Sequence, residues 1–177
     1  ILDLALYYYG LGHAKESIEL LSNAGNSPKA EVWLAYLLKD SDSPKSDKLL
    51  KQVLMGPTDF IFPYRREAIP VLEWAESRMP NWKFKYFLAQ NYIAVGLLDK
   101  GEELLKSCGD SPDSDVFYRF RAKTLKSSSY GDKLKDYQKA LSLNNGNWLV
   151  WNEMIQFYLA NENYSDAQKL SAKAYKK

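Results

Sequence analysis

Apolar residues recur every three or four positions along the chain, so most segments have one apolar face and one polar face. This spacing is the period of an α-helix, whereas the strict alternation typical of a β-strand is nearly absent. The pattern predicts helices over residues 2–10, 14–23, 29–39, 45–54, 65–78, 82–95, 98–107, 114–127, 131–142, 148–160 and 164–175. We therefore expect an all-α protein.

Most glycine and proline residues lie between the predicted helices rather than inside them. Short breaks occur at Gly25–Pro28, Asp42–Pro44, Gly109–Pro112 and Asn145–Gly146, and residues of this kind end one helix and begin the next. Connections this short make neighbouring helices antiparallel. Among the prolines, Pro70 is the exception, since it lies in a helical segment, where only the first turn tolerates proline.

One helical hairpin recurs about every 33 residues, and its clearest copies begin at Asn81 and Trp148. In each copy, a helix rich in aromatic residues precedes a helix with small residues at fixed offsets. Small residues such as Ala89 and Gly101 let two helices approach to about 8–9 Å, and large residues such as Tyr92 fill the space around them. A repeat of this length indicates a solenoid, in which stacked hairpins build a continuous core.

The repeated positions resemble the tetratricopeptide repeat, a helix-turn-helix unit of about 34 residues. The third copy matches at Leu88, Ala89, Tyr92, Gly96, Gly101, Leu105, Cys108 and Pro112, and the last at Trp151, Met154, Ile155, Tyr158, Ala167, Ser171 and Ala174. The first copy matches at Leu4, Ala5, Tyr8, Gly12, Ser17, Leu21, Ala24 and Pro28, and the fourth at Ala122, Leu125, Tyr137 and Ala140. The second is degenerate, because Asp47 occupies a position that the family fills with alanine.

The resemblance implies a right-handed α-α superhelix, a TPR-like solenoid of about five helical hairpins, as a single domain over residues 1–177. Within it we expect two hairpins over 1–55, an irregular loop and a single helix over 56–80, and three clearer repeats over 81–177. The chain starts at Ile1 inside a helical pattern. We therefore expect a fragment of a longer protein.

A narrower resemblance involves the segments 62–65, 72–75, 81–83 and 107–110. They are similar to a bacterial family of unknown function, in which such repeats follow large β-rich domains with a carbohydrate-related role. This resemblance implies the C-terminal repeat region of a multidomain bacterial protein and no known reaction. The compartment is left open between the bacterial cytoplasm and the periplasm.

Composition excludes several classes of function. The net charge is +2, from 24 basic and 22 acidic residues, which is too even for a protein that binds nucleic acid or a membrane surface. No apolar run approaches the roughly 20 residues that span a bilayer. The single cysteine, Cys108, excludes an internal disulfide, and the single histidine, His13, excludes most histidine-based metal sites. We expect neither a metal nor a cofactor.

The family resemblance suggests where a ligand would bind, because tetratricopeptide repeats grip peptides from the first helix of each hairpin. The corresponding positions here are Lys83, Tyr86, Gln90, Arg119, Lys123, Lys126, Asn152 and Gln156. This set is polar and net positive, which suits a carboxylate or an acidic peptide through charge-assisted hydrogen bonds. The alternative is an ordinary solvated helix face.

The segment 60–66 is the least ordinary stretch and forms a candidate docking loop. Its candidate residues are Phe60, Phe62, Tyr64, Arg65 and Arg66. One interpretation is an exposed aromatic patch with two arginines that binds an apolar or anionic partner, such as an upstream domain. The other is that the aromatic side chains are buried in the junction between hairpins.

The expected function is a non-catalytic scaffold that binds a protein, a peptide or a neighbouring domain on the face of its first helices. The alternative is an accessory helical domain of a carbohydrate-active protein, packed on its own upstream domain. A third hypothesis is an enzyme built as a ring of helical hairpins. Glu73 and Glu76 share a helix face but stand among Arg65, Arg66 and Arg78, as surface charges usually do. We expect no enzyme.

Overall fold

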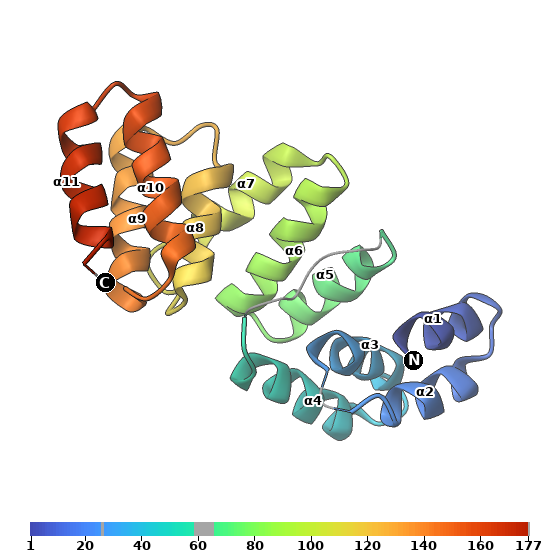
Figure 1. Ribbon diagram of the computed structural model, residues 1–177. Helices are drawn as coiled ribbons and strands as arrows, with labels where there is room; N and C mark the ends of the chain where they lie inside the picture. The colour runs from blue at the N-terminus through green and yellow to red at the C-terminus, as the bar shows by residue number, and fades with distance from the viewer. Residues whose placement is uncertain (26, 59–65, 177) are drawn as a thin grey trace. The chain divides into compact units, whose positions relative to one another are not determined.

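The structure is a computed structural model, and it describes residues 1–25, 27–58 and 66–176. In these residues it contains eleven helices and no strand (Figure 1). The helices are α1 (Leu2–Gly10), α2 (Ala14–Ser22), α3 (Pro28–Leu38), α4 (Ser43–Met55), α5 (Ala68–Arg78), α6 (Trp82–Ala94), α7 (Leu98–Ser107), α8 (Asp115–Thr124), α9 (Tyr130–Leu143), α10 (Trp148–Ala160) and α11 (Tyr164–Ala174). The prediction of an all-α protein is confirmed.

Every predicted helix is present, and only the ends differ. The largest shifts are at α5, which begins at Ala68 rather than at residue 65, and at α8, which ends at Thr124 rather than at residue 127. Pro70 therefore lies in the first turn of α5, where its missing N–H has no helical acceptor to lose. Leu125 has an extended backbone and closes α8 early.

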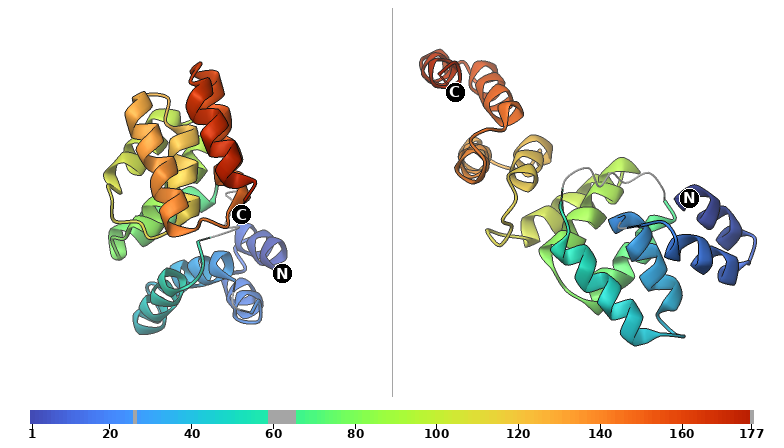
Figure 2. Two further views of the ribbon diagram at one scale, coloured as in Figure 1. Left: turned by 60° about the vertical axis from the view of Figure 1, so that its left-hand side comes forward. Right: turned by 60° about the horizontal axis from the view of Figure 1, so that its bottom comes forward.

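The helices pack as hairpins in chain order. The pairs are α1 with α2, α3 with α4, α6 with α7, α8 with α9, and α10 with α11, while α5 packs singly on α3 and α6. The chain forms two compact units, unit 1 over Ile1–Gly109 and unit 2 over Asp110–Lys177. Figure 2 shows the hairpins of each unit from two further sides. A single domain over 1–177, with the subdivision given above, stays a prediction.

Small residues bring α6 and α7 together, as the repeat pattern predicts. Ala89 is fully buried, and a Cβ on Gly101 would lie 2.5 Å from Cγ1 of Ile93 and 3.0 Å from the carbonyl oxygen of Ala89. Leu105 is fully buried one turn further along α7. The two helix backbones are thus as close as glycine allows.

The turn inside three of the hairpins has the same backbone conformation. Gly12 and Gly96 have φ values of 82° and 87°, and Glu162 has a φ of 57° at the matching place before α11. The residue that follows each of them donates its N–H to a carbonyl near the end of the preceding helix. The structural repeat is therefore visible in the turns as well as in the helices, and Glu162 occupies a position that favours glycine.

Candidate functional site

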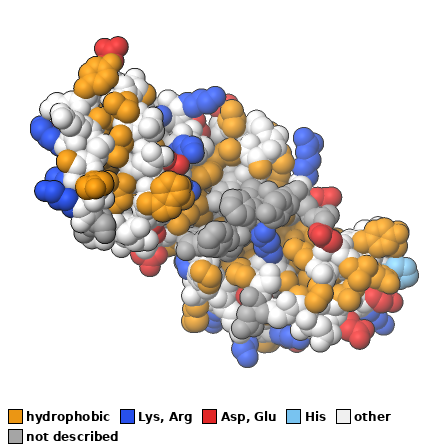
Figure 3. All heavy atoms as spheres, viewed as in Figure 1, with side chains coloured by type: hydrophobic (Ala, Val, Ile, Leu, Met, Phe, Trp, Pro, Cys, Tyr) orange, Lys and Arg blue, Asp and Glu red, His pale blue; other side chains and the backbone are white. Residues whose placement is uncertain are grey.

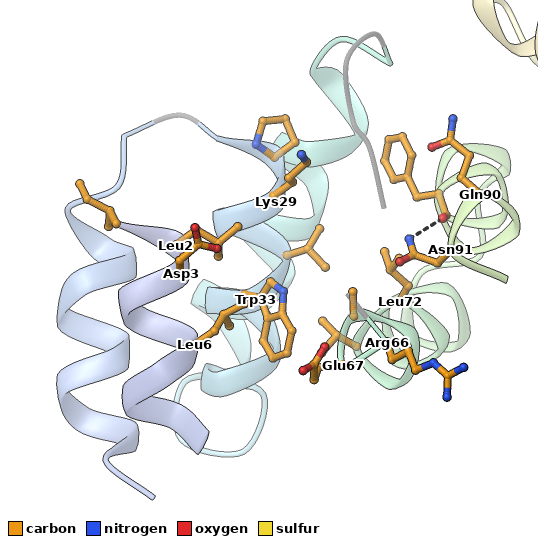
Figure 4. Close-up of a pocket in the computed structure, with 16 residues that line it drawn as sticks. Leu2, Asp3, Leu6, Lys29, Trp33, Arg66, Glu67, Leu72, Gln90 and Asn91 are labelled. Carbon is orange, nitrogen blue, oxygen red and sulfur yellow. Dashed lines mark hydrogen bonds between the residues drawn. The ribbon is translucent and has the colours of Figure 1, made fainter. Parts of the chain in front are cut away.

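The first helices of the hairpins in unit 1, together with α5, line a pocket of about 880 Å³ (Figure 4). We call it the unit 1 groove. Its apolar floor comes from three helices, with Leu6 on α1, Val32 and Trp33 on α3, and Val71 and Leu72 on α5. Trp33 and Leu72 are buried, with 6% and 7% exposure. Apart from Leu6, which is partly exposed, the floor is therefore built from core residues.

Polar side chains surround this floor. Asp3 comes from α1, Lys29 from α3, and Arg66 and Glu67 from the turn before α5, so the rim carries both signs of charge. Gln90 of α6 lies across the pocket from Asp3 (Figure 4). Its Oε1 atom is buried and has no hydrogen-bond partner in the described part of the chain. A buried amide oxygen without a donor costs about 1–3 kcal/mol.

The three unit 1 residues that the family resemblance suggests as ligand contacts have different locations in the structure. Gln90 lines the groove. Lys83 instead donates from Nζ to the carbonyl oxygens of Leu54 and Gly56, both at 2.7 Å, so it caps the C-terminal end of α4. Tyr86 is only 1% exposed and belongs to the core. In this structure Lys83 is engaged by the end of α4 and Tyr86 is covered by the core, so neither side chain faces a ligand.

In unit 2 the predicted basic residues of α8 meet a carboxylate from α10. Arg119 Nη1 and Lys123 Nζ lie 3.3 Å and 3.1 Å from the same oxygen, Oε1 of Glu153. We call these three residues the Glu153 cluster. The family pattern did not predict Glu153 as a site residue. In the sequence, only its position next to the candidate Asn152 could have indicated it. Asn152, Gln156 and Lys126 are exposed.

A second arginine of α8 has a different role. Arg121 donates from Nε and Nη2 to the two carboxylate oxygens of Asp136 on α9, at 2.8 Å and 2.7 Å. Its guanidinium also lies 5.1 Å from the ring centre of Phe117 and 5.2 Å from that of Tyr118. This buried fork-to-fork pair holds the hairpin of α8 and α9 together.

Of the candidate docking loop, Phe60, Phe62, Tyr64 and Arg65 lie outside the described residues. Arg66 is described, is exposed, and contributes to the rim of the unit 1 groove. Whether the aromatic residues of this loop bind a partner stays a prediction.

The described residues contain no group of three or more His, Cys, Asp or Glu side chains arranged to hold a metal ion. Cys108 is buried at 4% exposure, close to the carbonyl oxygen of Leu104, and His13 is exposed. Among the described helices, none combines the length and the apolar character needed to cross a membrane.

The hairpin architecture can be compared with solved structures. The structure of MamA from Desulfovibrio magneticus RS-1, residue 41 to the end, superposes with a TM-score of 0.55 at 10% identity, covering 98% of this chain and 90% of that one. The fold is that of MamA, a tetratricopeptide-repeat protein. Two structures of MamA AMB-1 give TM-scores of 0.54 and 0.53 at 18% and 14% identity, covering 98% of this chain and 94% and 95% of theirs.

At these identities the likeness to MamA concerns the fold alone. It confirms the expectation of a tetratricopeptide-like helical repeat. No family model matches the chain, and no curated protein matches it either. The narrower resemblance to a bacterial family with β-rich domains gains no support from these comparisons.

Proposed function

We propose that this chain is a non-catalytic scaffold that binds a peptide segment of a protein partner in the unit 1 groove. The observation that carries the proposal is the groove itself, because its apolar floor is formed by helices α1, α3 and α5. A MamA-like fold is consistent with an interaction scaffold. From the residues that the sequence indicated, Gln90 stays in this site, and Arg119, Lys123, Lys126, Asn152 and Gln156 stay as candidates in unit 2.

The size and chemistry of the groove favour a peptide over a whole domain. A volume of about 880 Å³ lies within the roughly 300–1,000 Å³ of ordinary ligand pockets. It accommodates several side chains, not a flat domain surface. The floor selects apolar side chains. The rim carries two cations, Lys29 and Arg66, and two anions, Asp3 and Glu67. This mixture favours a ligand that carries both signs of charge.

This proposal can be tested by selecting peptides from a displayed library on the wild-type protein and measuring their binding to two variants. One variant changes the groove, and the other makes the same substitution outside it, so that an effect on binding can be told from an effect on folding. Ala68→Glu places a carboxylate in the groove at the first residue of α5, where the helix dipole favours a negative charge. Ala14→Glu makes the same change at the first residue of α2, which is exposed and does not line the groove. Both variants are expected to fold as the wild type does.

Peptides selected on the wild type are expected to lose at least about tenfold in affinity on Ala68→Glu, which corresponds to about 1.4 kcal/mol, and to bind Ala14→Glu normally. Selected peptides that bind all three proteins equally, or a selection that yields no binder, would reject the groove as the binding site.

A second candidate function is packing against another domain of the same polypeptide, and the outer face of α1 favours it. Leu4, Tyr7 and Leu11 recur at helical spacing and are 49%, 65% and 56% exposed. Figure 3 shows apolar side chains gathered at this end of unit 1, beside the single histidine. If an adjoining domain covers this face, amide hydrogen exchange in α1 will be slower in the presence of that domain than in this chain alone. Unchanged exchange would reject this candidate.

A further inference from the structure

The turn between α9 and α10 contains the only asparagine of the chain that precedes a glycine, Asn145 before Gly146. Both residues are exposed and lie outside the helices. The backbone oxygen of Asn145 accepts the indole N–H of Trp151 at 2.8 Å, while its side-chain amide makes no hydrogen bond to the described residues. The carboxamide can therefore rotate toward the peptide bond that follows it.

The nitrogen of Gly146 is within reach of this carboxamide. Glycine has no side chain, so nothing hinders the approach of its nitrogen to the preceding residue. In the described part of the chain, its N–H has no backbone acceptor and donates to the exposed side-chain oxygen of Asn144, at 3.1 Å. Inside a helix, the same N–H would be bonded to a backbone carbonyl. The turn thus presents a nucleophile and an electrophile side by side in solvent.

Three other asparagines of unit 2 are exposed, and each is protected. Asn144 is bonded at both ends of its carboxamide, to Asp115 and to Gly146. Asn161 donates from Nδ2 to a helix carbonyl at 2.7 Å, and Asn152 lies inside α10. The residue after each of the three has a side chain, which hinders attack by its backbone nitrogen.

We propose that Asn145 is a site of spontaneous deamidation, and that one of its products opens the turn between α9 and α10. Hydroxide takes the proton of the Gly146 N–H, and the nitrogen attacks Cγ of Asn145. A C–N bond forms, and the side-chain nitrogen takes a proton from water and leaves as ammonia. Water then hydrolyses the cyclic imide. Cleavage at the side-chain carbonyl leaves aspartate, and cleavage at the backbone carbonyl leaves isoaspartate.

Isoaspartate lengthens the backbone by one carbon, because the chain then runs through the former side chain. The turn is closed at its normal length. Asn144 and Asn147 donate from Nδ2 to the same oxygen of Asp115, at 3.2 Å and 2.7 Å, and Oδ1 of Asn147 caps α10 by accepting the N–H of Leu149. A longer backbone moves these groups apart, and the new carboxylate adds a like charge to the turn that already holds Asp115. The start of α10 is then released.

Peptide mapping by mass spectrometry tests the site during incubation of the chain at mildly alkaline pH. Gly146→Ala is the matched variant, because Gly146 has no positive φ and an added Cβ meets only Oδ1 of Asn144, at 3.4 Å. It is expected to fold as the wild type does and to deamidate at least about tenfold more slowly, since the methyl group raises the barrier to attack. Asn161 is the internal reference and should keep its amide. Equal rates in wild type and Gly146→Ala, or an intact Asn145 amide in the folded wild type while the denatured chain deamidates, would overturn the assignment.

Amide hydrogen exchange tests the consequence. In the isoaspartate form, separated by ion exchange, Leu149 and Val150 are expected to exchange at least about tenfold faster than in fresh protein, because Asn147 no longer accepts their N–H groups. Asn145→Asp carries the same charge on a backbone of normal length and should change these rates by less than about twofold. Unchanged exchange in the isoaspartate form, or equal acceleration in Asn145→Asp, would overturn the release of α10. Neither result depends on peptide binding in the unit 1 groove.

Discussion

Gly101→Ala tests the close approach of α6 and α7 on which the hairpin depends. A methyl group at this position would lie 2.5 Å from Cγ1 of Ile93 and 3.0 Å from the backbone oxygen of Ala89. Ile93 can move its side chain, but the carbonyl of Ala89 belongs to α6 and cannot shift without moving the helix. The substitution should therefore separate the two helices.

The size of the effect follows from two opposing contributions. Replacing glycine by alanine inside a helix stabilises it by about 0.8–1 kcal/mol, whereas overpacking a core costs about 1–3 kcal/mol. The expected net result is a loss of up to about 2 kcal/mol in the free energy of unfolding. Gly10→Ala supplies the control in the same unit, because Gly10 ends α1 and an added Cβ there meets nothing within 4 Å.

Denaturant unfolding of both variants, followed by far-ultraviolet circular dichroism, measures the difference. Gly10→Ala should equal or exceed the wild type in stability, and Gly101→Ala should fall below it. In an Ile93→Ala background, Gly101→Ala should lower the free energy of unfolding by less, because the Ile93 side chain no longer obstructs the new methyl group and only the carbonyl oxygen of Ala89 remains. Equal stabilisation by Gly101→Ala and Gly10→Ala would refute the close-packing argument.

Three further predictions concern single contacts. Asp136→Asn leaves Arg121 buried with a neutral partner and should lower the free energy of unfolding of unit 2 by about 3–5 kcal/mol, measured by denaturant titration; a loss below about 1 kcal/mol would contradict the role of the fork. Lys83→Met should cost about 1–2 kcal/mol and speed amide exchange at the C-terminal end of α4, while unchanged exchange there would contradict the cap. Burial and the hydrogen bond to Glu73 raise the pKa of Tyr92 from 10.0 to about 12. The contribution of this tyrosine to the free energy of unfolding is therefore complete below pH 10 and is lost as the pH rises through about 12. Between pH 10 and 12, the midpoint temperature of thermal unfolding should fall less steeply with pH in Tyr92→Phe than in the wild type. Equal slopes for the two proteins would contradict the assignment.

The fold could be predicted from the sequence because its signals are local. The period of apolar residues fixes the helices, and turn residues such as Gly96 fix where the hairpins reverse. The small residue at Gly101 fixes which faces meet. The ends of α5 and α8 were harder to predict, since Arg66 and Leu125 continue the helical pattern and only the backbone shows that the helix does not.

The candidate site could be predicted only in part, because side chains at equivalent repeat positions have different neighbours. Lys83 lies at a ligand-facing position of the repeat pattern, but the end of α4 lies within its reach and accepts its hydrogen bonds. Tyr86 is covered by its surroundings. Glu153 is brought to Arg119 and Lys123 by the packing of one hairpin on the next, and no spacing within a single repeat shows this contact.

The central claim is that the unit 1 groove binds a peptide. Its most direct test is methyl NMR of the wild-type protein, with labelled leucine and valine, while a peptide selected on that protein is added. The account predicts large shifts at Leu6, Val32 and Leu72, which line the groove, and none at Leu141 of α9, outside this unit. Shifts that spare the groove while the peptide binds elsewhere would contradict it.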